Sequence, residues 1–160
     1  MSTESKCIIA VRIRGRVGLR RDTEDTLNLL HLTRANHATI LPSNPSCLGM
    51  LQKVKDYVTW GEGTPETVSL LLRRSGEFSG GAKLAEEGLT GRSSFTLVDD
   101  LANALCAGTA GLKDVQGLEP TFRLHPPRGG FRRSRKRAYA SRGELGYRGE
   151  AIVDFISSMV

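Results

Sequence analysis

The chain has 160 residues, of which 39% are hydrophobic and 25% are charged, and its formal net charge is +6. This length and apolar content suit one globular domain, or one domain with an insertion, and they exclude a wholly disordered basic tail. No stretch approaches the roughly 20 apolar residues that cross a bilayer, and no apolar signal core follows the polar start, so we expect a soluble, cytoplasmic protein without a membrane partner.

The first segment with a clear pattern is residues 7–14, in which apolar side chains recur at every second position. That period of two predicts a strand with one face toward a core, and it places Arg12 and Arg14 on the other face. A loop follows at 15–21. The acidic residues at 22–25 then predict the start of a helix, because carboxylates stabilise a helix N-terminus.

Strand and helix patterns continue to alternate. A β-rich run at 38–41 ends at Pro42, an apolar helical stripe spans 46–57, and a third strand follows at 58–60. Strand, helix, strand, helix, strand in about 60 residues predicts a small sheet covered by two helices. We therefore expect an α+β fold whose core, residues 1–63, is a ferredoxin-like β-α-β-α-β sheet.

The middle region, 64–118, is predicted to be an all-helical insertion. Thr64 is suited to cap a helix that has Pro65 at its first position. After a glycine-rich break, a weaker helical pattern covers 82–87, and Thr96 is expected to open another helix. The leucines of that last helix recur at a spacing of four: Leu97, Leu101 and Leu105.

The third region, 119–160, is expected to hold a fourth strand at 121–124. The prolines and glycines of 125–130 cannot continue a strand. Residues 131–148 show no apolar period and are rich in arginine, which predicts an extended basic arm. Apolar residues at helical spacing in 150–160 predict a helix that docks on the body, so both ends of the arm are expected to be held.

The positive charge is concentrated in one stretch. From Arg123 to Arg148 the chain has nine Lys or Arg residues and one acid, Glu144, a local balance of +8. The remainder has 14 basic and 16 acidic residues, a balance of −2. Since more than the whole surplus lies in this stretch, a polyanion is the natural partner.

Aromatic residues Phe131 and Tyr139 flank the densest run of charge, so phosphate pairing and base stacking are both available there. A localisation signal or a merely solvated charge run remains an alternative. The candidate RNA-binding residues of this region are Arg123, His125, Arg128, Gly129, Gly130, Arg132, Arg133, Arg135, Lys136 and Arg137.

A second candidate surface lies at the end of the first strand, where Arg12, Arg14 and Arg16 alternate. Arg20 and Arg21 lie nearby, and the alternative for these two is simple pairing with neighbouring acids. Two separate basic surfaces suggest contact with a folded RNA from more than one direction. Reading of duplex DNA would need a recognition helix with exposed polar side chains, and no predicted helix has such a face.

A catalytic or metal constellation is not evident. The three histidines have no ligand spacing, the three cysteines are far apart and odd in number, and no nucleotide-binding fingerprint is present. We therefore expect no catalytic residue, metal, cofactor or small-molecule substrate. Two alternatives stay open: an RNA-modifying or RNA-processing enzyme that uses the basic arm for delivery, and an acylphosphatase-like hydrolase that uses Arg14 with Asn36.

Several motifs in order resemble one known family. Arg12-Ile13-Arg14-Gly15, Asp25-Thr26-Leu27, the run 34–39 and the run 49–54 are together similar to the large-subunit ribosomal protein L thirty. The segment 123–130 resembles the C-terminal part of its longer archaeal form, whose eukaryal counterpart is protein L seven. The match covers residues 7–61 motif by motif and the remainder through the order of its parts.

The resemblance implies a protein that stabilises the large ribosomal subunit by binding its large rRNA, with 5S rRNA and neighbouring ribosomal proteins as further candidate partners. It places Arg12, Arg14 and Arg16 on rRNA. It implies a second contact near the turn between helix and strand, formed by Arg34, Asn36, His37 and Lys53.

Overall fold

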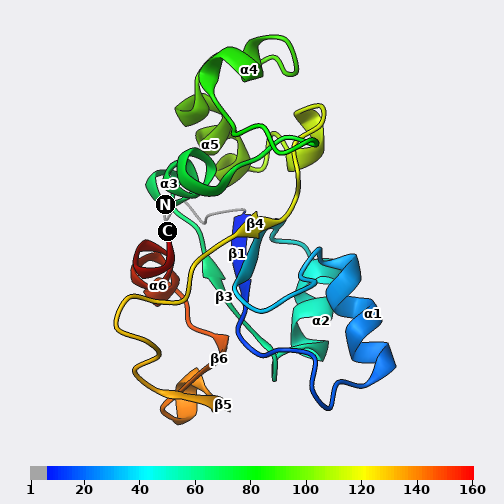
Figure 1. The fold of residues 1–160 in the computed structure, drawn as a ribbon, viewed down its shortest axis with the longest axis vertical. Helices are drawn as coiled ribbons and strands as arrows, with labels where there is room; N and C mark the ends of the chain where they lie inside the picture. The colour runs from blue at the N-terminus through cyan, green and yellow to red at the C-terminus, as the bar shows by residue number, and fades with distance from the viewer. Residues whose placement is uncertain (1–6) are drawn as a thin grey trace.

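A mixed sheet of six strands forms the centre of the molecule (Figure 1). The computed structural model describes residues 7–160. Short 3-10 turns cover Leu112–Asp114 and Tyr139–Ser141. The other elements, in chain order, are β1 (Cys7–Arg12), α1 (Arg21–Leu29), β2 (His37–Pro42), α2 (Pro45–Lys53), β3 (Val58–Glu62), α3 (Pro65–Ser75), α4 (Glu86–Thr90), α5 (Val98–Ala107), β4 (Phe122–Arg123), β5 (Ser134–Ala138), β6 (Gly143–Tyr147) and α6 (Ala151–Met159).

The strand order confirms the predicted fold class. The sheet runs β4-β2-β1-β3-β6-β5, and β1 is antiparallel to both of its neighbours. The strands β2 and β3 therefore run the same way with β1 between them, joined through α2, which gives the split arrangement of a ferredoxin-like α+β sheet. On the outer sides, β4 pairs antiparallel with β2, and β6 pairs parallel with β3.

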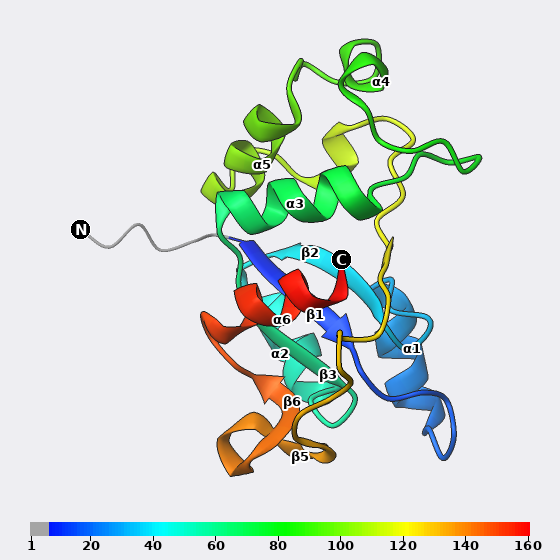
Figure 2. The same ribbon diagram turned by 60° about the vertical axis from the view of Figure 1, so that its left-hand side comes forward.

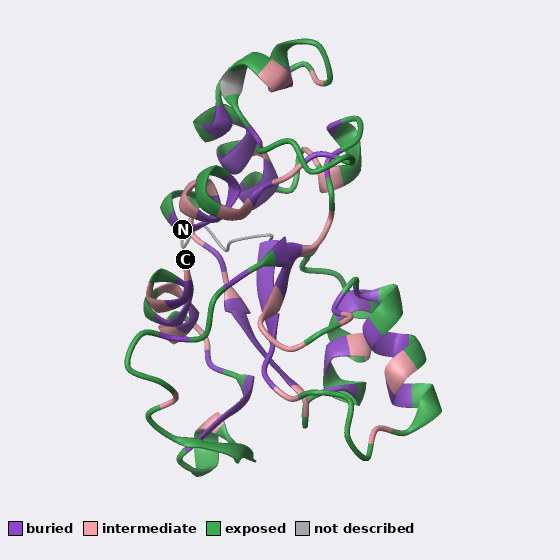
Figure 3. Cartoon of the chain, in the orientation of Figure 1, coloured by how far each residue is buried: buried purple, intermediate pink, exposed green. Residues whose placement is uncertain are grey.

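Both faces of the sheet are covered, so every residue of β1 is buried (Figures 2 and 3). On one face, Ile8 and Ala10 pack in a cluster with leucines of α1 and α2. On the other, Ile9 and Val11 pack with apolar side chains of α3, α5 and α6. The sequence pattern predicted the first layer of helices. The second layer arises because the helical segment after β3 folds back on the sheet.

Helix α3 begins at the capping residue that the sequence predicts. Thr64 Oγ1 accepts a hydrogen bond from Thr67 N at 3.3 Å at the start of α3, and Pro65 is the first helical residue. Two expectations in the same region are wrong. The helix predicted at 82–87 forms instead as α4 at Glu86–Thr90, and Leu97 lies before α5 with 46% of its surface exposed.

The C-terminal helix forms as predicted. In α6 the expected apolar residues Ile152, Phe155, Ile156 and Met159 are all buried. A close approach holds this helix on the sheet, since a Cβ added at Gly61 of β3 would collide with the carbonyl oxygen of Gly149. No helix in residues 7–160 has the length and apolar character needed to traverse a bilayer.

The expectation of an arm without sheet pairing is wrong for part of 131–148. Residues of β6 join the central sheet through Thr59↔Gly146 and Trp60↔Tyr147, and β5 pairs with β6. Gly143 lies against the backbone of Arg137, where a side chain would collide. The arm is therefore extended, as predicted, but β5 and β6 within it belong to the sheet, and the first four residues of β6 are buried.

Candidate nucleic-acid interface

The basic residues between positions 123 and 142 are all exposed, and we call them the C-terminal basic surface. Every residue of β5 is exposed, in contrast to the buried strand β6 beside it (Figure 3). The surface comprises eight side chains, namely Arg123, Arg128, Arg132, Arg133, Arg135, Lys136, Arg137 and Arg142.

Backbone hydrogen bonds hold the first half of this segment on α6. His125 N donates to Met159 O at 3.1 Å, and Arg128 N donates to Ser158 O at 3.0 Å. Gly129 and Gly130 then turn with positive φ, a conformation that favours glycine. These bonds hold the chain just before the arm, and the pairing of β6 with β3 holds its other end. The predicted residues His125, Gly129 and Gly130 lie exposed before the arm.

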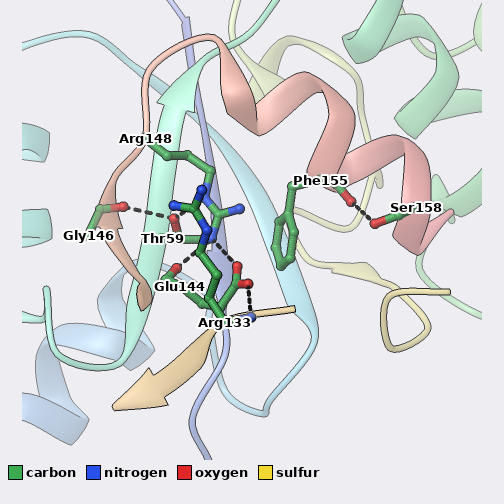
Figure 4. A network of polar contacts seen from close by, with 7 residues as sticks. All are labelled: Thr59, Arg133, Glu144, Gly146, Arg148, Phe155 and Ser158. Carbon is green, nitrogen blue, oxygen red and sulfur yellow. Dashed lines mark hydrogen bonds and ion pairs between the residues drawn. The ribbon is translucent and has the colours of Figure 1, made fainter. Parts of the chain in front are cut away.

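Beneath the surface, Arg148 and Glu144 form a buried ion pair (Figure 4). Arg148 Nη2 lies 2.9 Å from Glu144 Oε2, and Arg148 Nε donates to Thr59 Oγ1 at 2.7 Å. The guanidinium also lies over the ring of Phe155, 4.1 Å from its centre. Burial lowers the pKa of Arg148, and its hydrogen bond to the Glu144 carboxylate opposes that shift.

The Glu144 side chain also holds the backbone of the arm in place. Its second carboxylate oxygen, Oε1, accepts from the backbone N–H of Arg133 at 3.0 Å. The side chain of Arg133 is left outside, where its guanidinium lies 4.9 Å from the centre of the Tyr139 ring. Sequence reasoning counted Glu144 as the one acid of the basic stretch but missed this role; the available signal was an acid four residues before an arginine in an otherwise basic segment.

The second predicted patch differs from expectation at Arg12, which is 1% exposed. Its Nη1 donates to Leu32 O and its Nε to Arg14 O, both at 2.9 Å, while Nη2 has no hydrogen-bond partner in the described chain. Burial, followed by the charge of Arg16, lowers its pKa. The prediction that Arg12 lies on an open face is wrong, because α1 and α2 cover that face.

The neighbouring arginines are more accessible. Arg14 is half-buried with its guanidinium 5.1 Å from the Tyr57 ring centre, and Arg16 and Arg21 are exposed. Arg20 lies 3.6 Å from Asp22, which matches the alternative of simple pairing with a nearby acid. The N-terminal basic surface is defined here as Arg14, Arg16, Arg20, Arg21, Arg34 and His37.

The turn before β2 brings predicted residues from distant parts of the chain together. His37 pairs in register with Arg123 of β4, and burial, then the charge of Arg123, lowers the pKa of His37. Asn36 has φ of 66°, and its backbone accepts from Leu124 N and donates to Arg12 O. Asn36 therefore joins three strands. Exposed Arg34 and Lys53 lie before β2 and at the end of α2.

Parts of the two basic surfaces lie toward the same end of the molecule. Figures 1 and 2 show the loop after β1 and the strand β5 both at the end that lies away from α4. The sequence suggested contact from more than one direction. The loop after β1 and the strand β5 therefore carry positive charge toward the same end of the molecule.

The cysteines make no metal site in residues 7–160, where no three His, Cys, Asp or Glu side chains converge. All three are buried. Cys7 Sγ lies 3.2 Å from Cys106 Sγ, and this contact, together with burial, raises the pKa of Cys106. Cys7 of β1 and Cys106 of α5 belong to the same apolar core cluster.

Comparison with known proteins gives consistent matches. Residues 8–58 match the family described as ribosomal protein L30p/L7e. Large ribosomal subunit protein uL30 of Methanopyrus kandleri is 48% identical over 149 residues, 92% of this chain and 100% of that protein. The uL30 proteins of Korarchaeum cryptofilum (43% over 157 residues; 98% and 97%) and Thermoplasma acidophilum (44% over 153 residues; 96% and 92%) are also similar. The likeness thus extends well beyond residues 8–58, through the helical region and the arm.

Proposed function

This chain belongs to the ribosomal protein L30p/L7e family, and from that premise we propose that it binds and stabilises the rRNA of the large ribosomal subunit through its two basic surfaces. The role is structural, without catalytic turnover. It assembles with large-subunit rRNA and with neighbouring ribosomal proteins, and 5S rRNA is a further candidate partner. The relatives named above are themselves described as large ribosomal subunit proteins.

One observation carries the proposal. The one acid between Arg123 and Arg148 is buried and paired with the one buried arginine of that stretch. The eight remaining basic side chains are all exposed, so none of their charge is offset by an acid from their own segment. Such a surface is costly to hold together unless a polyanion neutralises it.

The mechanism follows from this arrangement. Phosphates of the RNA pair with exposed arginines and release condensed counterions, which supplies most of the affinity. The folded sheet supplies register, because Glu144 holds the Arg133 backbone and α6 holds the backbones of His125 and Arg128. The N-terminal basic surface extends the contact along the same end of the molecule.

The test is the salt dependence of binding to structured large-subunit rRNA, with the full chain. If about six to ten phosphates are neutralised, affinity falls by roughly 10³ to 10⁵ between 50 and 200 mM salt, by analogy with duplex DNA. The protein is also expected to co-sediment with the large subunit and to be stripped from it by high salt. A binding constant independent of salt, or equal affinity for RNA and a neutral polymer, would contradict the proposal.

A further inference from the structure

A cavity of about 280 Å³ lies between the arm and α6. Its walls include Arg128, Phe131, Arg132, Arg133, Tyr139 and Phe155. The buried pair of Arg148 and Glu144 also lines it, and Figure 4 shows that pair beside Phe155. Family membership does not account for this hollow, and its chemistry differs from that of a flat phosphate-binding surface because aromatic rings contribute to it.

Rings and guanidinium groups of the cavity already lie against one another. Arg133 lies 4.9 Å from the centre of Tyr139, and Phe131 and Phe155 have ring centres 6.2 Å apart. Arg133 is exposed, so its outer face is accessible. Unpaired RNA bases stack on aromatic side chains and on guanidinium planes alike, so a base can extend or enter the existing stack.

The charges of the cavity favour an anion. Arg128, Arg132 and Arg133 are exposed at its rim, whereas Glu144 is buried against Arg148 and Asp154 is the one exposed acid in the wall. Three cations against one acid attract a phosphate. A ligand that combines a planar base with a phosphate uses both properties of the cavity.

We propose that this cavity receives one unpaired nucleotide, with its base against the stack of Arg133 and Tyr139 and its phosphate at Arg128 and Arg132. The proposal rests on the proposed function, because the nucleotide is taken to be part of the bound RNA. The cavity lies just below the range of roughly 300 to 1,000 Å³ typical of small-molecule sites, so it admits a single nucleotide and not a paired helix. The site is preformed, since Glu144 fixes the backbone of Arg133.

The experiment compares two RNA hairpins that differ only by one bulged nucleotide, with affinity measured by fluorescence anisotropy at fixed salt. The bulged hairpin is expected to bind roughly tenfold more tightly, the effect of about one base stack. Tyr139→Leu is expected to abolish this preference, so that the two hairpins bind with equal affinity. The matched control is Tyr147→Leu, because Tyr147 is an exposed tyrosine on β6 outside the cavity wall.

A second pair of variants separates charge from stacking. Arg133→Gln and Arg137→Gln each remove one exposed positive charge, and both are expected to weaken binding of the paired hairpin by the same factor. Arg133→Gln alone is expected to lose the preference for the bulge. Tyr139→Phe keeps the ring and is expected to keep the preference. If Tyr139→Leu does not fold, as judged by thermal unfolding, Arg133→Gln decides the outcome.

The results distinguish the inference from the function on which it rests. Equal binding of both hairpins with a steep salt dependence would overturn the nucleotide site and leave RNA binding intact; no binding of either would overturn both. Titration of the full chain with AMP and with ribose 5-phosphate, followed by NMR, shows whether the cavity recognises the base or only the phosphate. Equal shifts from both ligands would reduce the cavity to an anion site. If AMP saturates the cavity but the two hairpins bind equally, the cavity binds a free nucleotide and not a nucleotide of the RNA. Either of these two results would overturn the proposal.

Discussion

The two basic surfaces each lie above a buried arginine, and the two arginines are neutralised differently. Under the C-terminal basic surface, Arg148 is 7% exposed and pairs with Glu144. Beside the N-terminal basic surface, Arg12 is 1% exposed and bonds only to carbonyl oxygens, with no acid within ion-pair distance in the described chain. A charge can thus be buried through an opposite charge or through peptide dipoles.

This difference decides where charge is available to a partner. The C-terminal segment buries its single acid and leaves its other basic side chains exposed. At the N-terminal surface, Arg14 bonds to Asp56 O and lies over Tyr57, and Arg20 lies near Asp22. We therefore expect the C-terminal surface to supply more of the affinity for RNA, and four experiments test that comparison.

The largest expected effect comes from Glu144→Gln. This change leaves the Arg148 guanidinium buried without its counter-charge, and breaking one partner of a buried pair costs about 3–5 kcal/mol of unfolding free energy. Urea unfolding measures the loss. Glu87→Gln is the control, because Glu87 is exposed on α4 and should change stability by less than about 0.5 kcal/mol. Equal losses in the two variants would show that the pair contributes nothing.

The second experiment compares the two buried arginines directly. Arg148→Met leaves the Glu144 carboxylate buried alone and is expected to cost about 3–5 kcal/mol of unfolding free energy. Arg12→Met leaves the carbonyls of Leu32 and Arg14 without that donor but also removes a charge that no acid offsets, so we expect a loss of about 1–3 kcal/mol. Urea unfolding of both variants gives the order. A larger loss for Arg12→Met would reverse the comparison.

The third experiment compares the exposed charges in RNA binding. The double variant Arg135→Gln, Arg137→Gln removes two charges from β5, and we expect the slope of log K against log salt to become shallower by about 1.8. The matched pair Arg20→Gln, Arg21→Gln should change the slope by less than half as much, since Arg20 is paired with Asp22. Filter binding over a salt series measures both slopes. Equal changes would mean that the surfaces contribute equally.

The smallest expected effect concerns His37. Burial and the charge of Arg123 lower its pKa, so the unfolded chain binds this proton more readily than the folded one. The free protein should therefore lose stability as pH falls from above about 6.5 through the lowered pKa. A phosphate beside His37 opposes the shift, so RNA affinity should rise as pH falls from about 7.5 to 6, by less than about tenfold.

The measurement for His37 is the pH titration of its ring proton by NMR, with and without RNA. We expect the pKa to rise on binding and the pH dependence of affinity to disappear in His37→Gln. An unchanged pKa in the complex would place the RNA phosphates away from β2.

The strands and helices of the first 63 residues follow patterns that are local in the sequence. The period of two in β1, the acids at the start of α1 and the cap at Thr64 each act within a few residues, so they can be recognised without a structure. The exposed arginines from 123 to 137 were likewise evident from charge density alone. The same local reasoning failed at Arg12, because nothing near it in sequence shows that α1 and α2 cover its face.

What the sequence determined by itself was the order of elements, the excess of positive charge near the C-terminus and the family. Only the tertiary structure decided which charged side chains are buried and which partner each of them has. The β6 segment has no apolar period because Glu144 within it is buried by pairing with Arg148, and Arg148 also bonds Thr59 on the parallel strand β3, 89 residues earlier. Pairing between residues so distant in sequence leaves no local pattern, since its free energy depends on contacts that exist only after the sheet has formed.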